Sequence, residues 1–170
     1  MKPQANEHAP YFSRYIDLVP GDDIIPVIEA QTRETAALLG GISEEKSAFR
    51  YAPEKWSIKQ LVGHITDSER VFAYRLLCIA RGETQSLPGF DENDYMRGSN
   101  FDDLPFAELV DGLAAVRRST LSLLRGLSDE AWRRSGTANQ NKISVRALAY
   151  ALLGHERHHL RVLRERYLTA

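Results

Sequence analysis

Apolar residues recur every three to four positions along four long segments of this chain. In the last segment the recurring positions are Val145, Leu148, Leu152, His155, His159 and Val162. A period near 3.6 residues places such side chains on one face of an α-helix, and that face is buried against neighbouring elements. We therefore predict four amphipathic helices, at about residues 22–39, 57–81, 104–125 and 144–167.

The clearest helix boundary is the start of the second helix. Ser57 and Gln60 have the spacing of a capping box, in which each side chain bonds a free backbone N–H of the first turn. Trp56 and Leu61 are placed to form the hydrophobic staple, and Gly82 ends the helix. This pattern fixes the helix that carries His64.

The other helix ends have weaker signals of the same kind. Asp22 or Asp23 can cap the first helix, Asp103 lies near the start of the third, and Ser144 precedes the fourth. Two Ser-capped helical turns are predicted, one after residue 43 and one at residues 128–133.

The segments between the helices indicate the fold class. Residues 1–20 contain three prolines and predict an irregular arm, and residues 136–142 predict a polar loop. Residues 83–103 form a connection long enough to cross the bundle, so the second and third helices can run parallel. No segment predicts a strand. We expect an all-α four-helix bundle with one core, as a single domain over residues 1–170.

Composition narrows the class of partner. The 170 residues are 43% hydrophobic and carry a formal net charge of −1, without the basic excess of a nucleic-acid-binding protein. No apolar run has the length of a transmembrane helix, and the N-terminus lacks the apolar core of a signal peptide. The single cysteine, Cys78, excludes an intramolecular disulfide framework. We expect a cytoplasmic protein that binds neither nucleic acid nor membrane.

Histidine spacing carries the candidate chemistry. His155 and His159 are four residues apart, so both imidazoles lie on one helical face and can converge on one divalent cation. His64 continues the buried face of the second helix. His158 is rotated about 100° from His159 and is expected beside the site or at the surface, and His8 lies in the arm.

A structural interpretation competes with the metal site. His64 alone resembles an ordinary core histidine with hydrogen bonds, and the pair on the fourth helix resembles a polar helix end. However, a buried neutral imidazole needs partners for both ring nitrogens, and a cation would satisfy two such rings at once. Spacing alone leaves both interpretations open.

Two widely separated motifs resemble the DinB-like superfamily. The first runs from Trp56 to Ile65 (WSIKQLVGHI) and the second from Gly154 to Leu160 (GHERHHL). The run Glu69…Tyr74-Arg75 and the loop at residues 87–90 (LPGF) are also similar, and the likeness covers about residues 22–168. The resemblance implies a bundle of up-down-down-up order with a long crossover between the second and third helices. It also implies a divalent metal held by His64, His155 and His159.

The resemblance further implies a class of chemistry. Members of this superfamily are similar to metal-dependent S-transferases that use low-molecular-weight thiols, and to metal-dependent hydrolases. Zinc is the first choice of metal, with nickel, manganese or iron as alternatives, and a thiol is the expected co-substrate. An ion with an open coordination position lowers the pKa of a bound thiol or water.

Further side chains are candidates for roles near the metal. Asp67, one turn after His64, can orient an imidazole or accept a proton, or can be a surface carboxylate. Arg75 lies on the line of His64 and can meet an anionic substrate or pair with a carboxylate. Glu156 points away from the His155–His159 face, so we predict a surface position. Phe90 and Tyr95 can wall the pocket or close it.

Two classes of function remain at this point. The first is a metal-dependent enzyme, a thiol transferase or a hydrolase. The second is a non-enzymatic dimeric scaffold that binds metal or responds to stress, since no nucleotide, acyl-hydrolase or thioredoxin-like motif occurs. By analogy with small bundles of this family a homodimer is expected, with Tyr11, Phe12 and Tyr15 as candidate contacts.

Overall fold

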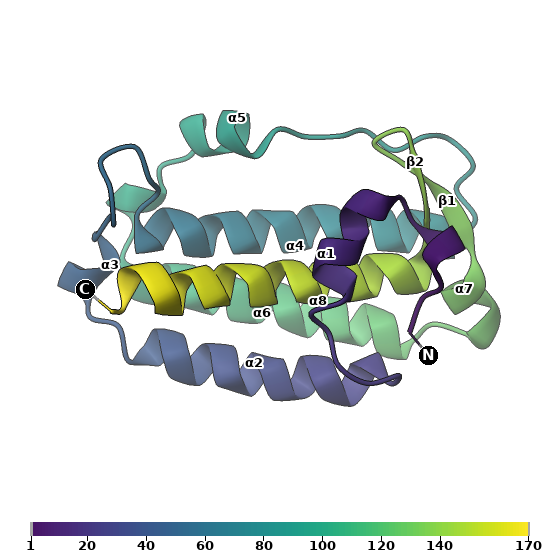
Figure 1. Ribbon diagram of the computed structural model, residues 1–170, viewed down its shortest axis with the longest axis horizontal. Helices are drawn as coiled ribbons and strands as arrows, with labels where there is room; N and C mark the ends of the chain where they lie inside the picture. The colour runs from purple at the N-terminus through teal and green to yellow at the C-terminus, as the bar shows by residue number, and fades with distance from the viewer. Residues whose placement is uncertain (1, 170) are drawn as a thin grey trace.

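Four long helices form the body of the protein in this computed structural model, which describes residues 2–169. They are α2 (Ile24–Gly40), α4 (Ile58–Ala80), α6 (Phe106–Arg125) and α8 (Val145–Val162). Figure 1 shows α4 and α6 beginning at the same end of the bundle, with α2 and α8 running the opposite way. The predicted four-helix bundle is confirmed. The predicted single domain includes Met1 and Ala170, which lie outside the described residues.

Predicted caps are present on three of the four long helices, and Ser43 and Ser128 cap the two short helices as predicted. The Asp23 carboxylate accepts a hydrogen bond from the backbone N–H of Ile25, and Ser144 accepts one from Ala147. Ser57 and Gln60 form the complete capping box at the start of α4. Each cap satisfies a backbone N–H that has no partner within its own helix. Local sequence therefore fixes where these helices begin.

The start of α6 differs from the prediction. Asp103 does not cap this helix but lies in the 3₁₀ turn η3 (Phe101–Asp103), and Pro105 precedes the first helical residue. The Glu44 carboxylate, from the short helix α3 (Glu44–Ser47), accepts the hydrogen bond of the Phe106 N–H at 2.8 Å. The free N–H of α6 is thus satisfied by a residue distant in sequence, which local pattern does not reveal.

A small antiparallel sheet replaces the predicted polar loop at residues 136–142. Strands β1 (Ser135–Ala138) and β2 (Asn141–Ser144) pair with Ser135 opposite Ser144 and Ala138 opposite Asn141. Both turn residues, Asn139 and Gln140, have positive φ, which matches the twist of a two-residue hairpin turn. The all-α prediction was wrong here, because four-residue strands and an Asn-Gln turn give a weak signal.

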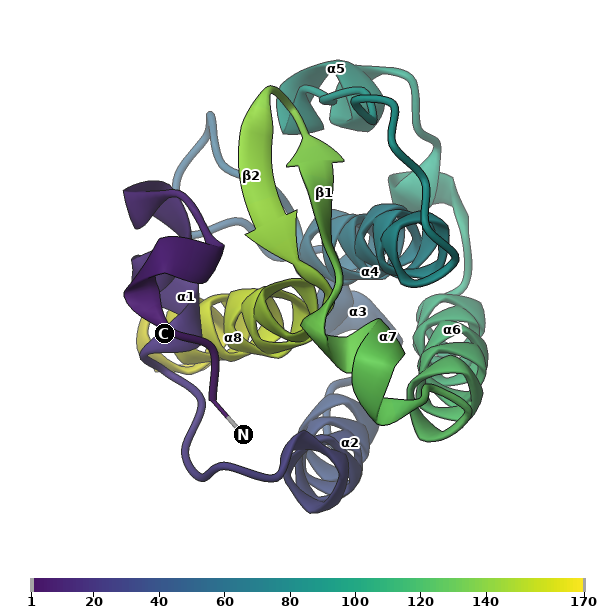
Figure 2. The ribbon, with the colours of Figure 1, turned by 90° about the vertical axis from the view of Figure 1, so that its right-hand side faces the viewer.

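The crossover between α4 and α6 is anchored to this hairpin. Leu87 donates a backbone hydrogen bond to Thr137 and accepts one from Asn139, both at 2.9 Å. Beyond this point the crossover contains the helix α5 (Glu92–Arg97) and η3, so it has structure of its own. The Ser128-capped helix α7 (Asp129–Arg133) leads from α6 into the hairpin, as Figure 2 shows end-on.

The N-terminal arm lies along α8. It contains η1 (Ala5–Glu7), η2 (Pro10–Phe12) and α1 (Ser13–Ile16), and Figure 1 shows α1 crossing the middle of α8. A Cβ atom at Gly154 would lie 2.0 Å from the Tyr15 carbonyl oxygen, so only glycine permits this approach. The arm is therefore a packed layer of the fold, not a loose tail.

Two apolar clusters fill the bundle. One includes Ile28, Leu76, Leu148 and Tyr150, and the other includes Leu61, Leu113, Leu160 and Tyr167. The second cluster extends over the predicted end of the fourth helix, where residues Leu163–Tyr167 form a π-helical turn (η4). The four long helices also bury polar and charged residues, among them Gln31, Glu69, Arg117 and Glu156. No helix within residues 2–169 combines the length and apolar character needed to cross a membrane.

Candidate metal centre

Three imidazoles from two helices meet at one point. The Nε2 atom of His64, on α4, lies 3.2 Å from the Nε2 atoms of both His155 and His159 on α8. The Nε2 atoms of His155 and His159 are 3.1 Å apart. Ligand nitrogens about 2.0–2.1 Å from one tetrahedral ion are about 3.3 Å apart. The structure thus brings together the three histidines selected from the sequence, with the spacing of metal ligands.

Hydrogen bonds cannot satisfy all three contacts between these Nε2 atoms. The Nε2 atom of a neutral imidazole is either a donor or an acceptor. With three such atoms in mutual contact, at least two are of the same kind, so at least one contact sets two donors or two acceptors against each other. A divalent cation accepts a lone pair from all three. The donor set therefore fits a metal ion better than it fits a hydrogen-bonded core.

Burial keeps these imidazoles neutral. Desolvation lowers the pKa of His64 to about 4, against a smaller opposing effect of Asp67. Desolvation and the neighbouring histidines lower the pKa of His155 to about 3, and they lower that of His159 as well. At neutral pH the ring lone pairs are thus free for coordination.

Aromatic rings hold two of the imidazoles in place. The Trp56 ring centroid lies 4.8 Å from that of His64, and Tyr15 lies 5.4 Å from His155 across an edge-to-face contact. The Phe72 ring centroid lies 6.0 Å from that of His155. Such packing restricts the rotation of the rings and orients Nε2 toward the common point.

A cavity of about 570 Å³ opens over the three histidines. Its walls come from α4 and α8, from the N-terminal arm, from the crossover and from the hairpin. The crossover contributes Phe90 and the hairpin contributes Asn139 and Asn141. Two of the four helices, α4 and α8, thus supply the candidate ligands, and the segments outside the bundle help to enclose the space where a substrate would bind.

Of the two candidate catalytic residues, Arg75 lines the cavity and Asp67 does not. Arg75 is buried and lines the cavity, as its position on the His64 line predicted. Asp67 does not line the cavity, and its carboxylate accepts a hydrogen bond from Arg70 at 2.8 Å on the outer side of α4. Its link to the site is the electrostatic effect on His64.

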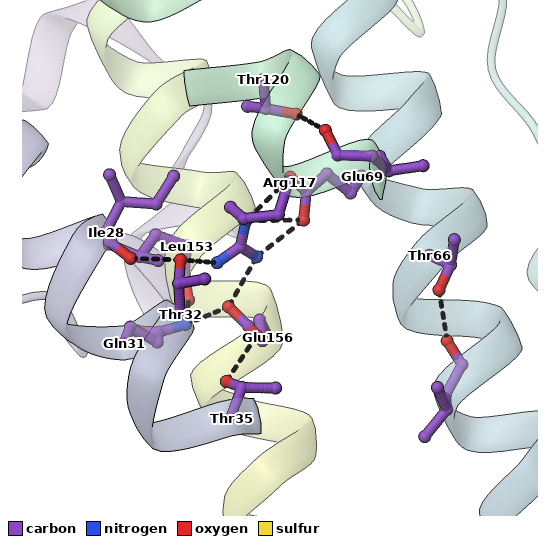
Figure 3. A network of polar contacts seen from close by, with 12 residues as sticks. Ile28, Gln31, Thr32, Thr35, Thr66, Glu69, Arg117, Thr120, Leu153 and Glu156 are labelled. Carbon is purple, nitrogen blue, oxygen red and sulfur yellow. Dashed lines mark hydrogen bonds and ion pairs between the residues drawn. The ribbon is translucent and has the colours of Figure 1, made fainter. Parts of the chain in front are cut away.

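Glu156 was predicted at the surface, and this was wrong. It is 2% exposed and lies in a charged network on the other side of α8, shown in Figure 3. Its carboxylate accepts hydrogen bonds from Thr35 at 2.8 Å, from Gln31 and from Arg117 at 2.7 Å. Arg117 also binds Glu69 through two nitrogens, at 2.8 and 2.6 Å. The network joins all four bundle helices behind the histidine site.

Of the remaining residues selected from the sequence, two line the cavity and two lie outside its lining. His158 lines the cavity, and its ring contacts those of Tyr15 and His159. The Nδ1–H of His8 donates a hydrogen bond to the Ala9 carbonyl, and His8 lies outside the cavity lining. Phe90 lines the cavity, whereas Tyr95 is half exposed and contacts Phe90 from outside.

Two of the aromatic residues suggested for a dimer contact have partners within the chain. Tyr15 is buried against His155, and Phe12 is partly buried against the core. Only Tyr11 is largely exposed. The homodimer stays a prediction, and so does the cytoplasmic location.

Comparison with known proteins shows the family. Residues 28–163 match the sequence profile of the DinB superfamily, which is most of the chain. This chain belongs to the DinB superfamily. A relative from Oceanobacillus iheyensis, named "Putative metal-dependent hydrolase", is 28% identical over 134 residues, covering 78% of this chain and 77% of that protein. The resemblance noted from the two motifs is confirmed.

Two solved structures share the fold of this DinB superfamily member. YfiT from Bacillus subtilis has a TM-score of 0.71 at 17% identity, over 97% of this chain and 90% of that chain. It is described as "a probable metal-dependent hydrolase with an unusual four-helix bundle topology". A DinB-like protein from the same species has a TM-score of 0.62 at 21% identity, over 87% and 92% of the two chains. At these identities the likeness supports the fold.

Proposed function

We propose that this protein is a metal-dependent enzyme in which His64, His155 and His159 bind one divalent cation. The observation that supports this most directly is the convergence of three buried Nε2 atoms at 3.1–3.2 Å, a contact that hydrogen bonding cannot satisfy. Three protein ligands leave a coordination position for a substrate, as in catalytic zinc sites. Zinc is the first candidate, with nickel, manganese and iron as alternatives.

A bound cation supplies Lewis acidity, which lowers the pKa of a coordinated water or thiol toward neutrality. The protein's own groups supply the rest. The imidazoles fix the position of the reacting atom, and the aromatic side chains of Trp56, Phe72 and Tyr15 keep the ring orientations and limit access of bulk water. The cavity walls hold the second reactant over the open position.

Hydrolysis is the reaction that the relatives' names favour. One of the similar proteins is named "Putative metal-dependent hydrolase", and another is described as "a probable metal-dependent hydrolase". In this reaction the oxygen of water forms a bond to an electrophilic carbon, the bond to the leaving group breaks, and the leaving group takes up the released proton. The cavity must then accommodate one substrate and one water.

Transfer to a low-molecular-weight thiol is the second candidate, and one observation favours it. Among the described residues Glu92 is the only carboxylate that lines the cavity, and it lies in the first turn of α5, away from the bundle helices. A thiol bound to a cation held by the three histidines would release its proton to solvent without a dedicated base, because the pKa of a free thiol, about 8.5, is already far below that of water. In this reaction a C–S bond forms and the leaving group departs with the bonding electrons.

Elemental analysis tests the metal site. We expect about one divalent ion per chain in the purified protein, and a loss of most of it in His64→Ala, His155→Ala and His159→Ala. His8→Ala is the matched control, since His8 lies outside the cavity lining. Chelation should also lower the midpoint of thermal unfolding, because the ion binds only the folded chain. A wild-type protein without bound metal would contradict the proposal.

A paired activity screen tests the reaction. Turnover of an ester or amide panel without thiol supports hydrolysis, and thiol-dependent consumption of an alkylating electrophile supports transfer. Either activity should disappear with chelator and return with metal. Full metal occupancy without turnover in both screens would favour the non-enzymatic metal-binding scaffold over an enzyme.

A further inference from the structure

We propose that the cavity over the three histidines binds a small molecule carrying a carboxylate or phosphate group, and that Arg75 recognises this oxyanion. The inference rests on the proposed function in one respect, since it names the class of ligand for the same cavity. The arginine's contacts, its position on α4 and the charge of the cavity walls support it independently.

Arg75 is a buried cation without an anionic partner. It is 6% exposed, and its Nη2 donates one hydrogen bond, to the Pro88 carbonyl at 2.6 Å. None of the ion pairs within residues 2–169 includes Arg75. The other deeply buried arginine, Arg117, has two carboxylates. Since a guanidinium has five N–H donors and burying its charge is costly, a ligand anion is the missing partner.

The position of Arg75 on α4 indicates where a ligand would lie relative to His64. Residues 64, 68 and 75 fall within about 40° of one another around a helix with 3.6 residues per turn. Arg75 Cα lies about 16 Å beyond His64 Cα along α4, and helical side chains lean toward the N-terminus, which here is toward His64. A ligand that bridges the two would have its anionic group several ångströms to about 10 Å from the candidate metal position.

Ser68 lies between these two positions and lines the same cavity. It is 1% exposed, and its hydroxyl has no hydrogen-bond partner in the described part of the chain. A buried hydroxyl without a partner costs free energy, which an acceptor oxygen of a ligand would recover. The wall formed by α4 thus offers both a charged and a neutral donor to an oxyanion.

The opposite wall adds a second cation. Arg14, in α1, lines the cavity, and its guanidinium carbon lies 3.8 Å from the Tyr11 ring centroid. It donates a hydrogen bond to the Tyr15 hydroxyl at 3.1 Å, and it takes part in none of the ion pairs of the described residues. The cavity lining therefore contains two guanidinium groups without an ion pair, those of Arg14 and Arg75, and one carboxylate, that of Glu92. This excess of positive charge attracts anions.

Anion titration of the protein over residues 1–170 tests the proposal. Trp56 lines the cavity and Trp132 does not, so a Trp132→Phe background makes tryptophan fluorescence a reporter of the site. We expect saturable changes with succinate, with inorganic phosphate or with both, and none with neutral succinamide. The preferred anion shows whether the group recognised is a carboxylate or a phosphate. Arg75→Gln should weaken binding about tenfold or more, and Arg75→Lys by less, because lysine retains charge but loses the two-pronged geometry.

Matched variants separate this proposal from loss of fold and from the metal site. Arg118→Gln removes the same charge from an exposed position of α6, which contributes no residue to the cavity, and should leave anion affinity within about twofold. His64→Ala should lose metal but retain anion binding. Equal affinity in wild type and Arg75→Gln, or no saturable binding of either anion by the wild type, would overturn the proposal, whatever the metal content.

Discussion

Neighbouring residues of α8 have unrelated roles because the middle of this helix is buried on every side. His155 faces the cavity, and Glu156, rotated about 100°, faces the charged network with Arg117. Residues 147–156 are buried without exception. The helical-wheel argument placed Glu156 correctly, away from the histidines, but it assumed that this direction was solvent. Periodicity gives the direction of a side chain and not what lies there.

At the residue scale, the charged network predicts an asymmetry between its members. Burial alone would lower the pKa of Arg117, but the adjacent Glu156 and Glu69 raise it. Arg117→Met leaves two buried carboxylates with no cation and should destabilise the fold by about 3–5 kcal/mol in urea unfolding. Glu156→Gln should cost less, because the Arg117–Glu69 pair remains.

Arg125→Met is the control for this prediction. Arg125 pairs with Glu29 at an exposed position, where a salt bridge contributes about 0–1 kcal/mol. A comparable loss of stability for Arg117→Met and Arg125→Met would show that the buried network does not stabilise the bundle.

At the scale of elements, the N-terminal arm explains why residues 147–156 of α8 are buried all round. The bundle helices α4 and α2 pack against α8, and α1 packs against it from the arm, where Tyr15 contacts His155 beside the cavity. Gly154 permits this contact, since its position has no side chain to separate the arm from the helix. An arm that looks irregular in sequence is therefore part of the site.

Gly154→Ala should detach the arm. A Cβ atom 2.0 Å from the Tyr15 carbonyl oxygen forces the backbone of α1 away from α8. We expect faster tryptic cleavage at Arg14 and a lower midpoint of thermal unfolding. Gly112→Ala, in the middle of α6 with open space around it, should instead stabilise by up to about 1 kcal/mol through helix propensity. Unchanged proteolysis of Gly154→Ala would contradict the role of this glycine.

At the scale of the whole molecule, the segments outside the bundle hold one another over the cavity. Glu7 in the arm accepts hydrogen bonds from Ser144, at the end of the hairpin, and from Arg146 in α8. The crossover bonds the hairpin through Leu87, and a Cβ atom at Gly89 would lie 2.3 Å from the Asn139 Oδ1 atom. Arm, hairpin and crossover thus form one connected cover.

Low pH should weaken the contacts of Glu7 with Ser144 and Arg146. Burial tends to raise the pKa of Glu7, but hydrogen bonds from Arg146, the Gln4 backbone and Ser144 outweigh it and hold the pKa at about 2, below the ordinary 4.5. The stabilisation is therefore complete above pH 4.5 and disappears as the pH falls toward 2. Glu7→Gln should lower the free energy of unfolding at pH 7 by on the order of 1 kcal/mol, with a difference that vanishes near pH 2.

Urea unfolding at several pH values measures this difference. Glu130→Gln is the control, because Glu130 pairs with Arg134 at an exposed position within one helical turn. A constant difference between wild type and Glu7→Gln from pH 7 to pH 3 would contradict the linkage.

The sequence by itself determined the features that depend on local spacing. These are the four helices, the caps at Asp23, Ser57 and Ser144, and the faces on which His64, His155 and His159 lie. Helical period and capping chemistry act within a few residues, so they can be recognised without a structure. The pairing of the two histidine motifs depended on their resemblance to a family.

The tertiary structure decided everything that depends on contacts between distant segments. Four features involve residues far apart in the chain. They are the distances between the Nε2 atoms, the cap that Glu44 provides for α6, the burial of Glu156 and the absence of an ion pair at Arg75. A side chain's helical face is set by its neighbours in sequence, but its partner is set by which element packs against that face. That packing decides whether a polar residue is a surface group, a member of a network or a wall of the site.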